Sequence, residues 1–221
     1  KMDKTYWLDR WDRKEIGFHQ TDINPYLQKY WHRLAIPSGS EVFVPMCGKS
    51  HDMLWLHQQG LAVLGVELSS SAALSFFQEN NLPPIRAELA PFIQLEHNHL
   101  QILCGDFFDL QEKHVQHVQA VYDRAALIAL PPEIRKRYIN HLLTILPKNS
   151  PILLITLDYP DSEMSGPPFA VTPQEVLTSY HSYDHIELLA QYDVLLQNPR
   201  FQERGLSRLH ENIFLISNQH H

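Results

Sequence analysis

Short apolar runs alternate with longer amphipathic segments along most of the chain. The apolar runs are rich in Val, Ile and Leu, and they are short enough to be buried strands of a parallel sheet. The predicted strands cover residues 41–46, 62–67, 100–104, 118–122 and 151–157.

Helices are predicted between these strands. Residues 49–59, 69–80 and 132–146 carry apolar side chains at helical spacing. Near the C-terminus the pattern changes, because 186–192 and 211–217 look like two strands joined by a polar, Pro-containing connection rather than by a helix. We therefore expect an antiparallel strand pair to close the sheet.

Strands that alternate with helices predict an α/β fold. We expect a doubly wound, mostly parallel, Rossmann-like sheet with the antiparallel C-terminal pair, in a single domain that covers residues 1–221. Sheets of this kind bind ligands beyond the carboxyl ends of their strands. The binding site is therefore expected after Met46, Glu67, Cys104 and Tyr122.

The composition and charge argue against a membrane-spanning, a nucleic-acid-binding or a secreted protein. The chain has 221 residues, of which 44% are hydrophobic and 19% charged, and no apolar run approaches the roughly 20 residues that span a bilayer. Its formal net charge of −7 argues against nucleic acid as a partner, since such proteins usually present a basic face. The charged N-terminal segment lacks the apolar stretch of a secretory signal, so we expect a cytoplasmic enzyme. Cys47 and Cys104 match no disulfide framework and no zinc pattern.

The segment EVFVPMCGKS at 41–50 joins a strand to a turn and a helix, which is where nucleotide-like ligands sit. Its GKS invites interpretation as a phosphate-binding loop. That loop needs a second Gly five residues before Gly48, and Phe43 stands there instead. The dinucleotide fingerprint GxGxxG is absent as well, so the motif favours neither an NTPase nor a dehydrogenase.

An acidic residue, Glu67, ends the second predicted strand about 20 residues after the first turn. A carboxylate at this position can accept hydrogen bonds from both hydroxyls of a ribose, in nicotinamide and adenosyl cofactors alike. The alternative is a Glu that caps a helix or is solvated.

Two further motifs follow predicted strands. In GDFFDL at 105–110, Asp106 is placed to accept a hydrogen bond from an adenine amino group, and Phe107 is placed to cover the adenine ring. A turn Asp beside a buried aromatic pair is the more common interpretation of such a motif. In VYDRAALIALPPE at 121–133, Asp123 and Arg124 are expected to face a cleft, where Arg124 can stabilise an anion but cannot act as a base. The alternative there is a structural ion pair between neighbours.

Six segments, in order along the chain, together resemble the bacterial type of the thiopurine S-methyltransferase family. Among them WLDRWDRKEIGFHQ, VFVPMCGKSHDMLWL and YDRAAL are specific, and GVELS, FDL and GPPF support them. They occupy residues 7–20, 42–56, 122–127, 65–69, 108–110 and 166–169, respectively.

The resemblance implies a class I methyltransferase fold that uses S-adenosyl-L-methionine and releases S-adenosyl-L-homocysteine. It implies methyl transfer to the sulfur of an aromatic or heterocyclic thiol, with selenium and tellurium species as further acceptors. It also implies that residues 1–35 form an N-terminal lid over the cofactor. No metal is expected to take part.

The resemblance also assigns residues to the two ligands. On the cofactor side it implies Trp7, Trp11, Met46, Glu67, Asp106, Phe107 and Arg124, and on the acceptor side Arg124, Arg204 and a ring that stacks on the acceptor, Phe18. Asp106 departs from the small hydroxyl residue of mammalian members. From the residues alone, Trp7 and Trp11 can equally form one packed helix face, and Phe18 can pack against the sheet.

Two other functions remain open at this stage. One is a methyltransferase for another small-molecule acceptor, such as a phenol or an amine, although no strong base or metal site is evident for an oxygen acceptor. The other is a non-catalytic sensor of the adenosyl nucleoside. The expected partner is a small-molecule thiol, with no nucleic acid and no membrane, and the chain is expected to be a monomer.

Overall fold

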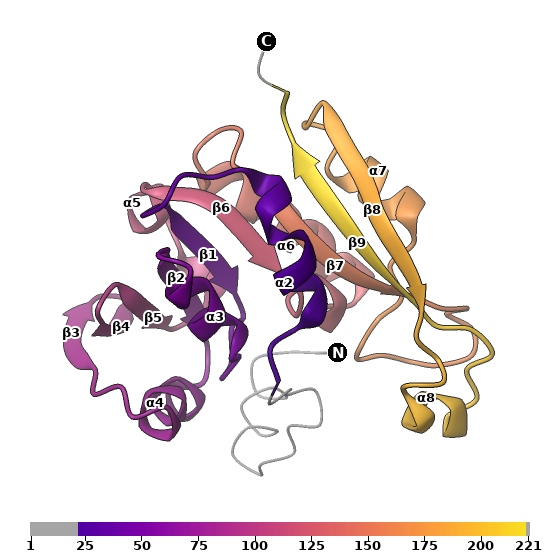
Figure 1. Cartoon of the computed structure of the whole chain (residues 1–221), viewed down its shortest axis with the longest axis horizontal. Coiled ribbons are helices and arrows are strands. Elements are labelled where there is room, and N and C mark those ends of the chain that lie inside the picture. The colour runs from indigo at the N-terminus through magenta and orange to yellow at the C-terminus, as the bar shows by residue number, and fades with distance from the viewer. Residues whose placement is uncertain (1–21, 220–221) are drawn as a thin grey trace. The chain divides into compact units, whose positions relative to one another are not determined.

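The computed structural model describes residues 22–219, which divide into two compact units. The first unit comprises 22–121 with Ile145–Pro147, and the second comprises Tyr122–Thr144 with 148–219. Figure 1 shows the elements of the first unit from indigo to magenta and those of the second toward yellow.

The first unit contains a mixed sheet in the order β3-β4-β5-β2-β1-β6. Strands β5, β2, β1 and β6 are parallel, whereas β4 pairs antiparallel with both β3 and β5. The four parallel strands confirm the prediction, but the β3–β4 hairpin was missed. Every residue of β3 is exposed, so this edge strand carries no apolar signal. The bounds are β1 Glu41–Pro45, β2 Ala62–Glu67, β3 Ile85–Leu89, β4 Phe92–His97, β5 Leu100–Cys104 and β6 Val118–Asp123.

Two helices of the first unit pack on its sheet: α3, Asp52–Gln58, contacts β2, and α4, Ser70–Glu79, contacts β2 and β5. Helix α4 begins where predicted because the Ser69 side chain accepts the backbone N–H of Ala72. Helix α3 starts three residues later than predicted, because the chain from Gly48 to His51 is still turning. Shorter helical turns are η2, Phe107–Asp109, and α5, Glu112–Val115.

The end of the predicted lid lies inside the described residues and is packed. Helix α2, Pro25–Tyr30, and the 3-10 turn η1, Trp31–Leu34, bury Leu27 completely together with most of the Trp31 side chain. The backbone N–H of Asn24 donates to Asp52 Oδ1 over 2.8 Å, which joins this segment to α3. Residues 1–21 lie outside the described part of the chain.

In the second unit, strands β7, β9 and β8 pair antiparallel in that order. Its strands are β7 Ile152–Asp158, β8 His185–Asp193 and β9 His210–Ser217, so the predicted antiparallel pair is confirmed. The expectation of no helix between them was wrong, because α8, Pro199–Glu203, forms there. Pro199 occupies its first turn, where a missing N–H costs nothing, so the residue that suggested a loop begins a helix.

The remaining helices of the second unit are η3 Leu127–Ala129, α6 Pro132–Ile145 and α7 Pro173–Ser179. The buried guanidinium of Arg135 on α6 binds both carboxylate oxygens of Glu175 on α7, over 2.8 and 2.9 Å. Bidentate geometry of this kind holds the two helices in one relative orientation.

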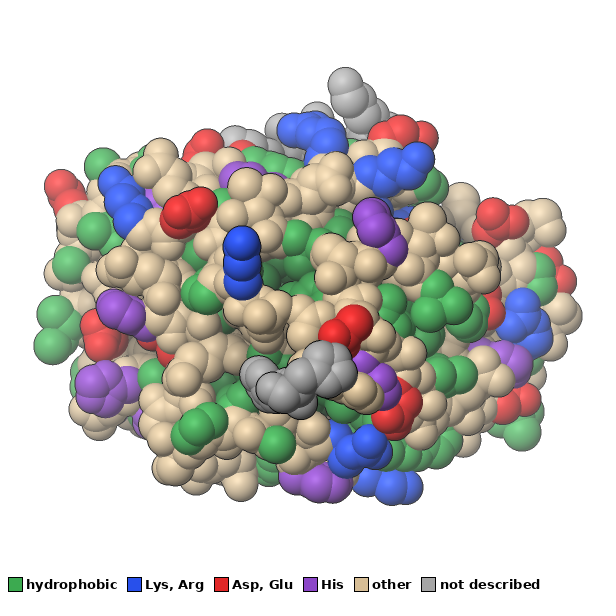
Figure 2. All heavy atoms as spheres, turned by 90° about the horizontal axis from the view of Figure 1, so that it is seen from above, with side chains coloured by type: hydrophobic (Ala, Val, Ile, Leu, Met, Phe, Trp, Pro, Cys, Tyr) green, Lys and Arg blue, Asp and Glu red, His purple; other side chains and the backbone are tan. Residues whose placement is uncertain are grey.

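On the face shown in Figure 2, acidic and basic side chains of the described residues are interspersed rather than gathered by sign. Between residues 22 and 219 no helix has the length and apolarity that crossing a membrane requires.

Candidate functional site

In the first unit, a tight turn follows the carboxyl end of β1. Met46 and Gly48 both adopt left-handed backbone angles, with φ of 51° and 55°, and the Cys47 N–H donates to the carbonyl of Val66 on β2. A left-handed conformation costs a residue other than Gly, here Met46, of order 1 kcal/mol, and residues strained in this way are frequent at ligand sites. The turn is therefore a candidate ligand-binding loop.

Glu67, the last residue of β2, lies beside this turn. Its Oε1 accepts the Gly48 N–H over 3.0 Å, and its Oε2 accepts the Ser69 N–H over 2.6 Å. Burial raises the pKa of the Glu67 carboxyl to about 7, against the opposing effect of these N–H groups. The carboxylate thus orients the β1 turn and the start of α4 together.

The Glu67 carboxylate keeps capacity for further hydrogen-bond donors. An ionised carboxylate has about four acceptor positions. The backbone N–H groups of Gly48 and Ser69 take one position on each oxygen, and the Leu68 N–H also acts on the carboxylate, which leaves at least one position for a further donor. Glu67 can therefore hold the backbone and also bind a ligand hydroxyl, so its structural role does not exclude the predicted ribose contact.

Gly65 allows β2 to approach the turn closely. A Cβ at this position would lie 2.7 Å from Cys47 Sγ and 3.1 Å from Met53 Sδ. We expect Gly65→Ala to destabilise the fold by about 1 to 3 kcal/mol, the usual cost of overpacking, as measured by urea unfolding. In a Cys47→Ala background the same substitution should cost less, because the Sγ atom is gone. An equal cost in both backgrounds would contradict the close-approach explanation.

Asp106 and Phe107 follow β5, as predicted, but both have structural roles. Asp106 Oδ1 accepts the Phe108 N–H and caps η2, and the Phe107 ring is buried, with its centroid 6.4 Å from that of Phe43 in a stacked pair. The turn Asp and the buried aromatic pair were the alternative interpretation of this motif.

In the second unit, Asp123 is buried rather than facing a cleft, so that expectation was wrong for this residue. Its Oδ1 accepts the backbone N–H groups of Ala126 and Leu127, and its Oδ2 accepts the Tyr138 hydroxyl over 2.6 Å. Arg124, next to it, is half-buried. Asp123 thus holds the turn that carries Arg124, instead of pairing with its guanidinium.

Glu211, the second residue of β9, is a partner of Arg124 that the sequence analysis missed. Burial raises the pKa of the Glu211 carboxyl to about 7, and the positive charge of Arg124 acts in the opposite direction. The sequence feature that could have identified Glu211 is its position directly before the apolar run NIFLI. The pairing of β9 with β7 and β8 places Leu157 and Tyr192 beside it.

Arg204 lies at the end of α8 and is exposed. Its Nη2 donates to the Ser165 carbonyl over 2.8 Å, directly before the Gly166–Phe169 segment. The Tyr159 hydroxyl donates to the Pro168 carbonyl of that segment. Arg204 is therefore attached to the GPPF motif that the resemblance also drew on.

The two cysteines are free and buried, as expected. Burial raises the pKa of the Cys47 thiol well above its usual value and that of Cys104 to about 11. Both thiols are therefore protonated and poorly nucleophilic near neutral pH. The part of the chain that the structure describes contains no cluster of metal-ligating side chains.

The predicted site residues are thus distributed over the two units. Met46, Glu67, Asp106 and Phe107 belong to the first unit, and Arg124 and Arg204 to the second. Trp7, Trp11 and Phe18 lie outside the described residues.

Known sequences resemble this chain over nearly its whole length. The family model "Thiopurine S-methyltransferase (TPMT)" matches residues 2–219. A thiopurine S-methyltransferase of Nitrosospira multiformis is 57% identical over 215 residues, which cover 97% of this chain and 98% of that protein. One from Methylococcus capsulatus is 45% identical over 219 residues, 99% of each chain.

Solved structures with low sequence identity share the fold. A SAM-dependent methyltransferase from Anabaena variabilis superposes with a TM-score of 0.68 at 14% identity, over 99% of this chain and 96% of that one. A phosphoethanolamine N-methyltransferase of Haemonchus contortus, in complex with S-adenosylhomocysteine, gives 0.66 at 11% identity, over 100% of this chain and 61% of that one. These similarities confirm the predicted class I methyltransferase fold.

Proposed function

Because the chain belongs to the thiopurine S-methyltransferase family, we propose that it transfers a methyl group from S-adenosylmethionine to the sulfur of an aromatic or heterocyclic thiol. The observation that carries the proposal is the buried Glu67 carboxylate at the end of β2, which accepts backbone N–H groups and has acceptor capacity left for a ribose. When bound, the cofactor supplies an already activated methyl sulfonium. The protein has mainly to position the acceptor.

On the cofactor side, we propose that Glu67 holds the ribose and that Met46 and Asp106 line the nucleoside. The strained turn at Met46 and the acceptor capacity of the Asp106 carboxylate support these assignments. Phe107 supports the site through its ring, which packs on that of Phe43. Trp7 and Trp11 retain their assignment from the family resemblance.

On the acceptor side, we propose that Arg124 and Arg204 favour the ionised form of the thiol. A guanidinium stays charged at any useful pH and donates to a thiolate or a ring nitrogen. Phe18 retains its predicted role as the ring that stacks on the acceptor. Selenium and tellurium species remain candidate acceptors for a screen.

Arg204 allows a direct test with 6-mercaptopurine as the acceptor. We expect Arg204→Ala to raise the Michaelis constant for this thiol about tenfold, because one charge-assisted hydrogen bond contributes about 1.5 to 3 kcal/mol. Donor affinity, measured by calorimetry, should not change. Arg86→Ala, an exposed Arg on β3, serves as the matched control.

Three other outcomes would redirect the assignment. An Arg204 variant with wild-type constants would remove this residue from the acceptor site. Methylation of phenols or amines without any thiol product would replace the acceptor class. Tight binding of S-adenosylhomocysteine without turnover of any acceptor would identify a sensor instead of an enzyme.

A further inference from the structure

One backbone segment of the second unit is hydrogen-bonded to the elements that carry both acceptor-side arginines. This bridging segment comprises residues 165–169 and contains the GPPF motif. The carbonyl of its first residue accepts Arg204 Nη2 over 2.8 Å. The N–H of its last residue, Phe169, donates to the Ile128 carbonyl over 2.7 Å. Ile128 belongs to η3, which follows Arg124 closely in the chain. The bridging segment therefore links the turn of Arg124 to the side chain of Arg204.

The turn that carries Arg124 is held at its other end by Asp123. The buried Asp123 carboxylate accepts the N–H groups of Ala126 and Leu127 over 3.1 and 3.3 Å. Its second oxygen accepts the hydroxyl of Tyr138 on α6 over 2.6 Å. The backbone at Arg124 is thus fixed between the end of β6 and η3, so that η3 connects it directly to the bridging segment.

The end that carries Arg204 is also fixed. Helix α8, which lies beyond the carboxyl end of β8 in Figure 1, ends at this residue. Just after the helix, the N–H and the hydroxyl of Ser207 both donate to the Glu163 carboxylate, over 2.9 and 2.8 Å. Met164 and Leu206 belong to one buried hydrophobic cluster. The chain around Arg204 is therefore held against the chain that leads into the bridging segment.

Two contacts fix the shape of the bridging segment itself. The Phe169 ring packs so closely on Gly166 that a Cβ at residue 166 would lie 2.5 Å from Phe169 Cδ1. The hydroxyl of Tyr159, a buried member of the same hydrophobic cluster, donates to the Pro168 carbonyl over 2.7 Å. The distance between the two ends of the segment therefore depends on Gly166, Phe169 and Tyr159.

We propose that the bridging segment sets the spacing of Arg124 and Arg204 and so selects acceptors that reach both guanidinium groups. This inference rests on the proposed thiol methylation. A bicyclic thiopurine carries its sulfur on one ring and further nitrogen acceptors on the other, whereas thiophenol has one ring and no nitrogen. Guanidinium donors are directional, so a small change in spacing weakens a ligand that must meet both. Gly166, Phe169 and Tyr159 are positioning residues that act through the two arginines.

Gly166→Ala tests this role, because the added Cβ has to displace the Phe169 ring and with it the N–H that binds Ile128. We expect the Michaelis constant for 6-mercaptopurine to rise about tenfold, and that for thiophenol to change by less than about twofold. Steady-state kinetics with both acceptors measures the ratio of the two constants. Calorimetry with S-adenosylhomocysteine should show unchanged donor affinity and a folded protein.

Two further backgrounds serve as controls. In a Phe169→Ala background, Gly166→Ala should raise the constant for 6-mercaptopurine by less than about twofold, because the ring atoms that the added Cβ meets are gone. Val176→Ala truncates a buried side chain on α7 in the same unit and controls for lost stability. It should leave the ratio of the two Michaelis constants at the wild-type value.

Tyr159→Phe is a milder variant that keeps the test informative if Gly166→Ala does not fold. It keeps the ring in the hydrophobic cluster and removes only the hydroxyl that binds the Pro168 carbonyl. We expect the Michaelis constant for 6-mercaptopurine to rise about threefold, without a matching rise for thiophenol.

The possible results separate the two proposals. An equal rise for both acceptors, or no rise for either, would overturn the selecting role of the bridging segment. An equal effect of Gly166→Ala with and without the Phe169 ring would do the same. If the wild-type protein methylates neither acceptor, the proposed function fails and this inference fails with it. If it methylates both and the variants keep the wild-type ratio, only the role of the bridging segment fails.

Discussion

Glu67→Ala is expected to weaken donor binding by about 2 to 4 kcal/mol, or about 30-fold to 900-fold in Kd, because a charge-assisted bidentate contact to the ribose is lost. The effect should exceed that of a simple contact deletion. The same carboxylate also accepts the N–H groups of Gly48 and Ser69, and truncation leaves both donors without it. Calorimetry with S-adenosylhomocysteine measures the loss.

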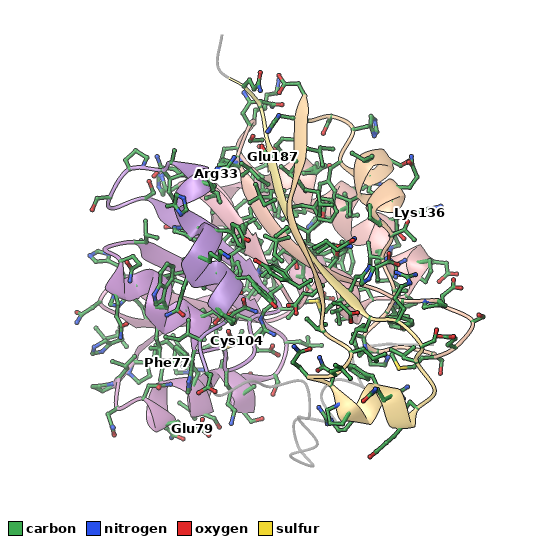
Figure 3. The ribbon with its side chains drawn as sticks, turned by 45° about the vertical axis from the view of Figure 1, so that its right-hand side comes forward. Arg33, Phe77, Glu79, Cys104, Lys136 and Glu187 are labelled. Atoms are coloured by element: carbon green, nitrogen blue, oxygen red, sulfur yellow. The ribbon has the colours of Figure 1, made fainter. Side chains whose placement is uncertain are left out.

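Glu79→Ala is a suitable control for this variant. Glu79 is an exposed carboxylate at the end of α4 in the same unit, labelled in Figure 3, and its partner is the Lys49 ammonium. Unchanged donor affinity in a folded Glu67→Ala protein would refute the ribose assignment. A Glu67→Gln variant separates charge from shape, since it keeps the volume of the side chain.

The donor affinity of the wild-type protein should also depend on pH. The pKa of Glu67 is raised to about 7 by burial, so the carboxyl group becomes protonated as the pH falls through 7 and then accepts ribose hydroxyls less well. Donor affinity should therefore decrease below pH 7, and Glu67→Gln should show no such change. Stability should change in the opposite direction: a raised pKa of a folded acid favours the folded state at low pH, and that contribution is lost as the pH rises through 7.

Arg124→Ala is expected to lower kcat/KM by about a hundredfold or more, because it removes the cation that we propose acts on both ligands. Unlike Arg204→Ala, it should impair donor binding and acceptor binding together. Glu211 would lose its electrostatic partner, so the pKa of that carboxyl group should rise further. Steady-state kinetics with 6-mercaptopurine across pH, with calorimetry for the donor, measures each of these effects.

Arg124→Lys distinguishes charge from geometry. It keeps the positive charge but loses the planar fork that donates several parallel hydrogen bonds. We expect it to recover donor affinity more fully than kcat. Recovery of both constants to wild-type values would mean that Arg124 acts as a point charge, and an Arg124→Ala variant with intact kcat/KM would remove the residue from the site.

The main elements of the fold could be read from the hydrophobic pattern. Strands β2 and β5 begin and end at the predicted residues, because a buried strand must be apolar along its length. The exposed strand β3 and the short helix α8 could not be found in this way. Neither buries enough apolar surface to leave a periodic signal: β3 depends on its pairing with β4, and α8 begins at Pro199.

The sequence alone also determined the family and placed Glu67, Asp106 and Arg124 at the ends of their strands, because motifs at strand ends are local in the chain. Only the tertiary structure revealed that Glu67 orients the β1 turn, that Asp123 is buried against Tyr138, and that Glu211 lies within electrostatic reach of Arg124. These relations join residues far apart in the chain. Burial, hydrogen-bond partners and pKa depend on neighbours that strand register and packing bring together, and a local pattern carries no record of them.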